Sequence, residues 1–360
     1  MKLLNKIILS ILIITLTLDS IQNNLYISSN ASTRNLVNVG VLVSNIADPF
    51  IIQIKQDLEN IQKNNKDKVK FTFFNAKSNQ SIQNETLDSL LNNDIDLLLV
   101  NLVDTSPNVI DYYIDKVRSK NLPLLLFNSQ PPAITNKMKG YQKFAIITTD
   151  PRESGTLQGK LIADEWNKHK STMDKNGDNI MQYIMLQGEL NNIGAIERTH
   201  SSISAIENAG IKTQQLALQT SNWNEELAKN AIEALFYKYA NRIEVIISNN
   251  DAMAIGAIQA LQKFGYNKGG TGNYIPVFGI DGIPDAQDLI RKGIMAGTVV
   301  EEPDDTAIAL YTIGLNLVNN KPPLEDTPYK FDKSGIIVRI PYRGTLSNNG
   351  FTAAATYLGP

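Results

Sequence analysis

The feature that most constrains this chain is a regular alternation of short apolar runs with amphipathic stretches. The first set of apolar runs occupies residues 37–44, 69–74, 95–101, 122–128 and 144–149, and the second set occupies residues 181–188, 211–218, 243–250, 274–281 and 295–300. Strands that are apolar along their whole length are typical of parallel sheets that helices cover on both faces. The sequence therefore predicts an α/β protein with two doubly wound, parallel-sheet lobes.

The C-terminal part departs from a simple tandem of two lobes. A helix is predicted over residues 302–320, and one more strand over residues 336–344. This tail indicates that the chain crosses back between the lobes through a hinge of several strands. We expect residues 36–148 and 302–335 to form the first lobe, and residues 149–301 and 336–356 the second. Ligands of doubly wound sheets bind at the carboxyl ends of the strands, so a ligand is expected in the cleft between the lobes.

Composition excludes several classes of protein. The 360 residues include no cysteine, which excludes disulfides, thiolate catalysis, zinc sites made of cysteine and a lipid-modified N-terminal cysteine. The 34 basic and 36 acidic residues nearly balance, which argues against a nucleic-acid-binding face. His169 and His200 lie in polar segments without a nucleophile pattern, and the glycine-rich run 269–272 precedes a strand instead of following one. We therefore expect that this protein is not an enzyme.

The first 31 residues are interpreted as an export signal. Lys2 and Lys6 precede a nearly apolar run at residues 7–18, which is short for a membrane-spanning helix and fits the core of a signal peptide. The small residues Ser29 and Ala31 predict cleavage after Ala31, and an uncleaved N-terminal anchor is the alternative. In both cases the rest of the chain is expected outside the cytoplasm, in the periplasm or at the cell surface.

Polar and aromatic side chains follow several of the predicted strands. Carboxylates, amides and a guanidinium bind sugar hydroxyls, because each hydroxyl both donates and accepts a hydrogen bond. Aromatic rings cover the apolar C–H patches of a sugar ring. The candidate residues at or near the strand ends are Asp48, Phe50, Asn128, Arg198, Trp223, Asn250 and Asp281.

Some of these residues also have a purely structural interpretation. Asp48, which precedes Pro49, and Asn250 fit the N-caps of helices. Trp223 fits a hydrophobic contact at a helix start, and Arg198 fits a surface ion pair. The hypothesis of a binding site therefore depends on the convergence of these side chains at the strand ends.

Residues 174–182 carry oxygen-bearing side chains at alternate positions. Positions 1, 3, 5, 7 and 9 of this loop are Asp174, Asn176, Asp178, Ile180 and Gln182. This is the spacing of a calcium-binding EF-hand loop, in which position 7 contributes only its backbone carbonyl. Position 12 is Met185, which cannot supply the usual bidentate carboxylate, so a distant acid would have to complete the site. A capped polar surface turn is the alternative.

Taken together, these residues resemble the periplasmic galactose/glucose-binding protein family, the sugar-binding components of ABC importers with the type I two-lobe fold. The resemblance covers residues 37–345 and is most specific at residues 100–105, 153–166, 243–257, 275–286 and 336–344. It implies binding of a galactose- or glucose-like monosaccharide, or its glycoside, for delivery to the membrane subunits of an ABC importer. It also implies a structural Ca²⁺ whose missing ligand falls on Glu244.

The resemblance further implies roles in the sugar site. Phe50 and Trp223 would sandwich the sugar ring, and the hydroxyls would be bound by Asp48, Asn128, Arg198, Asn250 and Asp281. Three positions depart from the family pattern: Asn192 replaces a histidine, Gly194 replaces an aspartate near the anomeric hydroxyl, and Glu301 replaces an asparagine. We retain Asn192 and Glu301 as candidate ligand-binding residues, and the three departures leave the identity of the sugar open.

A sugar-sensing ectodomain is the second function considered. It would signal to a membrane histidine kinase or to a chemoreceptor in chemotaxis, and the lack of a lipid-anchoring cysteine favours it. A transcriptional regulator of the same two-lobe class is disfavoured by the export signal and by the lack of a helix-turn-helix before Leu36. We expect a monomer that binds a small-molecule sugar and no nucleic acid.

Overall fold

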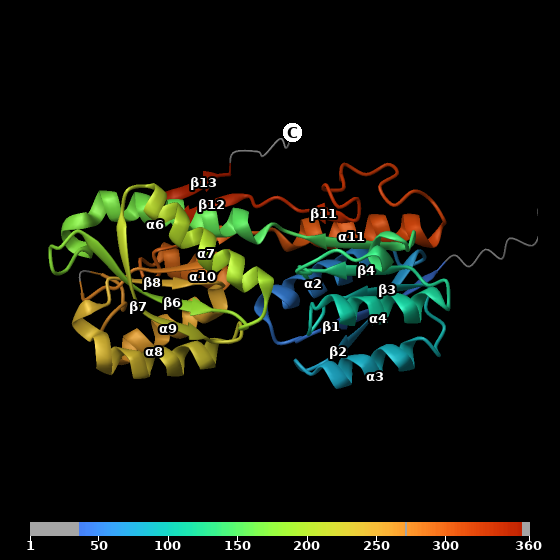
Figure 1. Cartoon of the computed structure of the whole chain (residues 1–360), viewed down its shortest axis with the longest axis horizontal. Helices are drawn as coiled ribbons and strands as arrows, with labels where there is room; N and C mark the ends of the chain where they lie inside the picture. Colours follow the sequence, from blue (N-terminus) through green and yellow to red (C-terminus); the bar gives the residue numbers. More distant parts are fainter. Residues whose placement is uncertain (1–35, 271, 355–360) are drawn as a thin grey trace, which may run out of the picture.

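The computed structural model describes residues 36–270 and 272–354, so the export signal predicted over residues 1–31 lies outside the described part. Two α/β lobes lie side by side along the long axis of the molecule, each with helices on both faces of its sheet (Figure 1). Within the described ranges, no helix is long and apolar enough to cross a bilayer.

The first lobe contains a six-stranded sheet in the order β11-β5-β4-β3-β1-β2, and all of its strand pairs are parallel. Its strands are β1 (Val37–Val43), β2 (Val69–Asn75), β3 (Leu97–Val100), β4 (Leu124–Phe127), β5 (Phe144–Thr148) and β11 (Ile337–Arg339). Its helices are α2 (Pro49–Asn64), α3 (Gln80–Leu90), α4 (Pro107–Arg118), α5 (Asn136–Lys139) and α11 (Pro303–Val318).

The second lobe contains a seven-stranded sheet in the order β13-β12-β10-β9-β8-β6-β7. Strands β6 to β10 are mutually parallel, and the β12–β13 hairpin joins antiparallel at one edge. The strands are β6 (Ile180–Gln187), β7 (Lys212–Thr220), β8 (Val245–Ser248), β9 (Val277–Asp281), β10 (Gly297–Val300), β12 (Gly344–Ser347) and β13 (Gly350–Ala353). The helices are α6 (Pro151–Met173), α7 (Ile193–Asn208), α8 (Glu225–Tyr239), the short 3-10 helix η1 (Ala240–Arg242), α9 (Asp251–Lys263) and α10 (Pro284–Arg291).

Three connections cross between the lobes, from β5 to α6, from β10 to α11 and from β11 to β12. One predicted boundary is wrong. We expected residues 336–356 to belong to the second lobe, but β11 pairs with β5 in the first sheet, and only β12 and β13 join the second. The apolar run 336–344 reads as one strand in the sequence. Pro341 cannot donate a ladder hydrogen bond, so the chain leaves the first sheet there.

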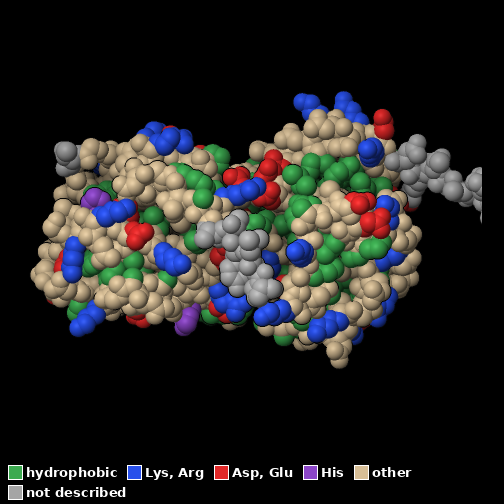
Figure 2. Space-filling model, turned by 90° about the horizontal axis from the view of Figure 1, so that it is seen from above, with side chains coloured by type: hydrophobic (Ala, Val, Ile, Leu, Met, Phe, Trp, Pro, Cys, Tyr) green, Lys and Arg blue, Asp and Glu red, His purple; other side chains and the backbone are tan. Residues whose placement is uncertain are grey.

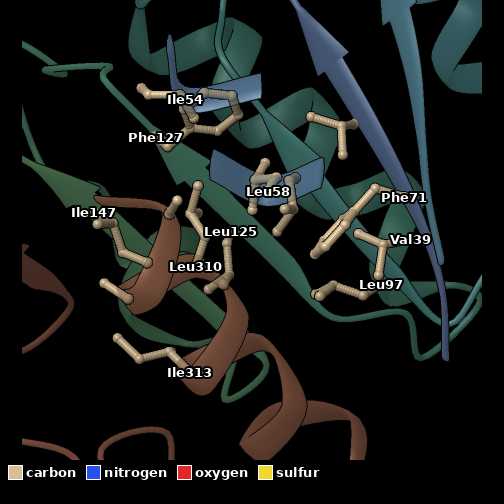
Figure 3. Close-up of a cluster of buried hydrophobic side chains, with 14 of the residues drawn as sticks. Val39, Ile54, Leu58, Phe71, Leu97, Leu125, Phe127, Ile147, Leu310 and Ile313 are labelled. Carbon is tan, nitrogen blue, oxygen red and sulfur yellow. The ribbon is translucent and has the colours of Figure 1, made fainter. Parts of the chain in front are cut away.

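The core of the first lobe explains why its strands are apolar throughout. Val39 and Val41 of β1 lie on the face covered by α2 and α11, whereas Leu42 lies on the opposite face among residues of α3 and α4. In Figure 3, Ile54 and Leu58 of α2 and Leu310 and Ile313 of α11 belong to the same cluster of buried side chains on this face of the sheet. Burying one such side chain contributes about 1.5–3 kcal/mol. The two buried faces fix the sheet, and with it the loops at its carboxyl edge.

Candidate functional site

A cleft lies between the carboxyl ends of the two sheets and contains about 830 Å³ of empty space, including the part that is open to solvent. Seen from above, the molecule narrows to a waist between the lobes (Figure 2). Most of the predicted ligand-binding residues line this cleft: Asp48, Phe50, Asn128, Asn192, Arg198, Trp223, Asn250 and Asp281. The remaining one, Glu301, lies behind Arg198, with its Oε2 atom 3.9 Å from Arg198 Nη2.

Arg198 on α7 lies at the base of the cleft and is only 9% exposed. Its Nη1 atom donates to the carbonyl of Asn249 (2.8 Å) and to Oδ1 of Asp281 (3.4 Å). Its Nη2 atom lies 3.5 Å from the hydroxyl of Tyr342. The interpretation of Arg198 as a surface ion pair is therefore wrong. The guanidinium is buried between the two lobes.

Two glycines of α6 determine how deeply Arg198 lies. A Cβ atom at Gly155 would lie 2.6 Å from the carbonyl oxygen of Arg198, and a Cβ atom at Gly159 would collide with the carbonyl of Ser202. Only glycine at these positions lets α7 lie directly against α6. The close packing brings the guanidinium to the strand ends.

Three cleft residues are also helix N-caps: Asp48 and Asn250, for which the sequence already suggested this role, and Asn192, for which it did not. Oδ1 of Asp48 accepts from the backbone N–H groups of Phe50 (2.9 Å) and Ile51 (3.1 Å) at the start of α2. Asn250 caps α9 and Asn192 caps α7 in the same way. Asn192 additionally donates from Nδ2 to Oε2 of Glu189 (3.1 Å). Capping holds these side chains at the cleft edge without removing them from it.

Two aromatic rings come from opposite lobes. Phe50, at the start of α2, belongs to the first lobe, and Trp223, between β7 and α8, belongs to the second. Trp223 has a positive φ of 59°, and its indole lies so close to Gly188 that any Cβ there would collide with the ring. The Arg198 guanidinium lies 5.7 Å from the indole centroid, within cation–π range. The indole is therefore held in place from two sides.

Several carboxylates surround the single guanidinium of Arg198. Burial raises the pKa of Asp48 and raises that of Asp281 well above its ordinary value, although Arg198 lowers both. Burial also raises the pKa of Glu301 to about 7, and Oε2 of this residue has no hydrogen-bond partner among the described residues. Burial lowers the pKa of Arg198, but Tyr342, Asp281 and Glu301 more than compensate and raise it overall. Such an acceptor-rich cleft suits a ligand that offers many O–H donors.

Several residues in or beside the cleft were not among the predicted ligand-binding residues. Asn101, Gln130 and Glu189 line the cleft, and each ends or follows a predicted strand, so the strand-end pattern already contained the signal. Tyr342 lies in the crossover from β11 to β12, and its hydroxyl donates to Oγ1 of Thr149 (2.8 Å) while facing Arg198. No local sequence pattern marks Tyr342.

The predicted calcium loop folds around Asp174. Its carboxylate accepts from the backbone N–H groups of Gly177 (2.9 Å) and Asn179 (3.0 Å). Glu244, just before β8, is 1% exposed and accepts from the N–H groups of Lys175 (2.8 Å) and Gln182 (2.8 Å). The distant acid implied by the resemblance therefore contacts both ends of the loop.

The carboxylates of this loop lie close together. Burial raises the pKa of Glu244, and the nearby Asp174 and Asp178 raise it further. Oδ1 of Asn176 accepts from the N–H of Asp178, and Nδ2 of Asn176 donates to the carboxylate of Asp178 (both 2.9 Å). Across the described part of the chain, no group of three or more acidic or histidine side chains has the arrangement of a metal site. The side-chain acceptors of the loop are all oxygen atoms, which is the donor type that Ca²⁺ requires.

Comparison with known proteins gives consistent results. Residues 39–322 match the family model of the periplasmic binding protein domain. The D-galactose/methyl-galactoside binding periplasmic protein MglB of Haemophilus influenzae is 35% identical over 323 residues, which cover 89% of this chain and 93% of that protein.

Solved structures share the fold. An ABC transporter solute-binding protein of Bacillus halodurans C-125 with bound myo-inositol has a TM-score of 0.70 at 20% identity, covering 89% of this chain and 97% of that one. A periplasmic solute-binding protein of Actinobacillus succinogenes 130z with bound D-allose has a TM-score of 0.71 at 19% identity, covering 87% and 98%. These likenesses confirm the two-lobed α/β fold that the sequence pattern predicts.

Proposed function

The chain belongs to the periplasmic binding protein family, whose members are non-enzymatic sugar-binding transport proteins of the type I two-lobe fold, and on this premise we propose that its cleft binds a galactose-like hexose or its glycoside. Family membership also assigns the protein to the outside of the cytoplasm. The bound sugar would be delivered to the membrane subunits of an ABC importer.

One observation carries the proposal: an aromatic ring from each lobe and a buried, acid-paired arginine line the same cleft. Phe50 and Trp223 can cover the two faces of a pyranose, because they approach from opposite lobes. Arg198 offers hydrogen-bond donors, and Asp48 and Asp281 offer acceptors. A sugar hydroxyl can therefore find a partner whether it accepts or donates a hydrogen bond. The similarity to MglB, which is described as binding D-galactose and methyl-galactoside, favours galactose over other hexoses.

The departures from the family pattern favour a substituted sugar. A Cβ atom at Gly194 would meet only Oδ1 of Asn192 within 4 Å, so this part of the cleft is open. A buried sugar hydroxyl that lacks a hydrogen-bond partner lowers the binding free energy by about 1–3 kcal/mol. Free galactose would therefore bind more weakly here than in a site that keeps the aspartate of the family pattern at position 194. A substituent on the anomeric carbon could occupy the open space.

We also propose that loop 174–182 binds Ca²⁺ through Asp174, Asn176, Asp178, the Ile180 carbonyl, Gln182 and Glu244. The EF-hand spacing of the loop and the contacts of Glu244 with both of its ends support this. A bound ion would join the loop to the segment before β8 and stabilise the second lobe.

Delivery to an importer is preferred to signalling. The relatives named above are described as transport or binding proteins, and none of these descriptions supports a histidine kinase or chemoreceptor as the partner. We propose that the protein acts as a monomer.

Calorimetry with the purified protein tests the proposed function. Galactose, methyl galactosides, glucose, ribose and myo-inositol would be titrated side by side, with calcium present. We expect saturable binding of galactose or its methyl glycosides and weaker binding of ribose and myo-inositol. The proposal is wrong if no hexose or hexoside binds. If the methyl glycosides bind no better than the free sugars, the proposal that an anomeric substituent occupies the space at Gly194 is refuted, while the proposal of hexose binding stands.

A further inference from the structure

The cleft does not end at the proposed hexose site. A second compartment with about 690 Å³ of empty space, including its solvent-open part, adjoins the first. The two compartments share four lining residues: Ser44, Asp48, Glu189 and Trp223. Both lobes contribute to the second compartment, through Asn45 and Ser78 of the first and Asn222 and Asn224 of the second. It is therefore a continuation of the interlobe cleft.

Trp223 lies at the junction of the two compartments. Asn222 and Trp223 both have positive φ values, 49° and 59°, so the loop between β7 and α8 turns tightly at this point. The turn places the indole where it lines both compartments. A sugar ring covered by Trp223 in the first compartment would therefore have a neighbouring space for a substituent.

The second compartment offers hydrogen-bonding groups of both kinds. Oδ1 of Asn45 accepts from the N–H of Ala47 (3.0 Å), and Oδ1 of Asn224 accepts from the N–H of Leu227 (2.9 Å). In each case the engaged oxygen fixes the side chain and leaves the amide NH₂ group to donate. Glu189 and Asp48, at the junction, offer acceptors. Paired donors and acceptors on a polar wall suit hydroxyl groups better than an apolar substituent.

We propose that this second compartment is a subsite for a second sugar ring, so that the cleft takes a galactosyl disaccharide with one ring in each compartment. The inference rests on the proposed function, because the first ring is the hexose of the proposed site. It extends that function from a monosaccharide or simple glycoside to a larger ligand class.

The test compares galactose with galactosyl disaccharides of several linkages by calorimetry, on three forms of the protein. Asn45→Trp fills the second compartment without altering a residue of the first. Asn319→Trp is the matched control, because Asn319 is exposed at the end of α11. We expect at least one disaccharide to bind the unmodified protein within tenfold of galactose. Asn45→Trp should weaken that disaccharide at least tenfold and change galactose binding less than twofold.

The outcomes separate this inference from the proposed function. If galactose binds and every disaccharide binds at least a hundredfold more weakly, the subsite is refuted and the hexose function stands. If a disaccharide binds without any free hexose binding, the subsite is supported and the monosaccharide function fails. Equal losses of galactose and disaccharide binding in Asn45→Trp, or no loss of either, would also overturn the subsite. A protein that binds none of these sugars would overturn both proposals.

Discussion

The carboxylate of Asp251 holds the turn that presents Asp281 to the cleft. Oδ2 of Asp251 accepts from the N–H groups of Gly282 (2.7 Å) and Ile283 (3.0 Å), the two residues that follow Asp281. Asp281 itself has a φ of 124°, a conformation that a non-glycine residue adopts only when its surroundings impose it. Oδ1 of Asp251 accepts from Oγ1 of Thr298 (2.7 Å). One buried acid therefore joins the start of α9 to the turn after β9 and to Thr298 of β10.

Replacing Asp251 should therefore weaken sugar binding although we assign it no ligand contact. We expect Asp251→Ala to weaken galactose binding about tenfold or more, on the scale of lost buried hydrogen bonds. Asp251→Asn should retain most of the affinity, because its Oδ1 can accept from both N–H groups while its Nδ2 donates to Thr298. Asn267→Ala is the control, since Asn267 holds the opposite end of β9 through Ile275. The role is refuted if both alanine variants weaken binding equally in calorimetry.

Trp223→Ala should lower sugar affinity by about 1–3 kcal/mol, the scale of losing a buried aromatic contact at a binding site. Trp223→Phe should recover part of that loss because an aromatic face remains. Calorimetry with galactose measures both variants, and thermal unfolding checks that each is folded. An affinity for Trp223→Ala equal to that of the unmodified protein would contradict the stacking role.

Removing calcium should destabilise the second lobe. A ligand at one hundred times its dissociation constant contributes about 2.7 kcal/mol to the folded state, so chelation with EDTA should lower the Tm and added Ca²⁺ should restore it. Glu244→Gln should weaken this response, because it removes the charge of a bidentate ligand. Glu226→Gln, on the exposed face of α8, is the control. A Tm that is unaffected by both EDTA and calcium excludes the site.

Glu301 should make the stability of the ligand-free protein depend on pH. Burial raises its pKa from 4.5 to about 7, so the folded state holds a proton more tightly than the unfolded state. The resulting stabilisation is complete below about pH 4.5 and is lost as the pH rises to about 7. The difference in unfolding free energy between Glu301→Gln and the unmodified protein should therefore shift in favour of the variant by about 1–3 kcal/mol from pH 5 to pH 8. Urea unfolding at both pH values measures this difference, with Glu85→Gln on α3 as the exposed control. An identical difference at both pH values would show that Glu301 does not titrate in this range.

The fold was predictable because burial on both faces leaves a continuous signal. Residues 97–100 are Leu-Leu-Leu-Val and all four are buried, so the strand stands out without any knowledge of its neighbours. The crossover was less predictable, because the pairing of β11 with β5 depends on which sheet a strand reaches and not on its own composition. In the sequence, only Pro341 indicates where the chain leaves the first sheet, because proline cannot donate a ladder hydrogen bond.

The site was predictable where its residues follow strands and less so where they meet across the fold. Asp48, Asn128 and Asp281 follow or end strands, and the topology of a doubly wound sheet brings such positions together. Tyr342 and Arg198 are 144 residues apart in sequence and meet only because the crossover from β11 to β12 brings Tyr342 beside the guanidinium. The dual role of Asp48, as a helix cap and a cleft residue, also needed the structure.

The most direct test of the central claim is tryptophan fluorescence during titration with galactose or its methyl glycosides. The chain has two tryptophans: Trp223 lines the cleft, and Trp166 is 1% exposed within α6. We predict a saturable change in the emission of the unmodified protein. In Trp223→Phe, calorimetry should still detect binding while the emission stays constant, because only Trp166 remains. A sugar that binds by calorimetry without changing the emission of the unmodified protein, or that changes the emission of Trp223→Phe equally, would contradict binding in this cleft.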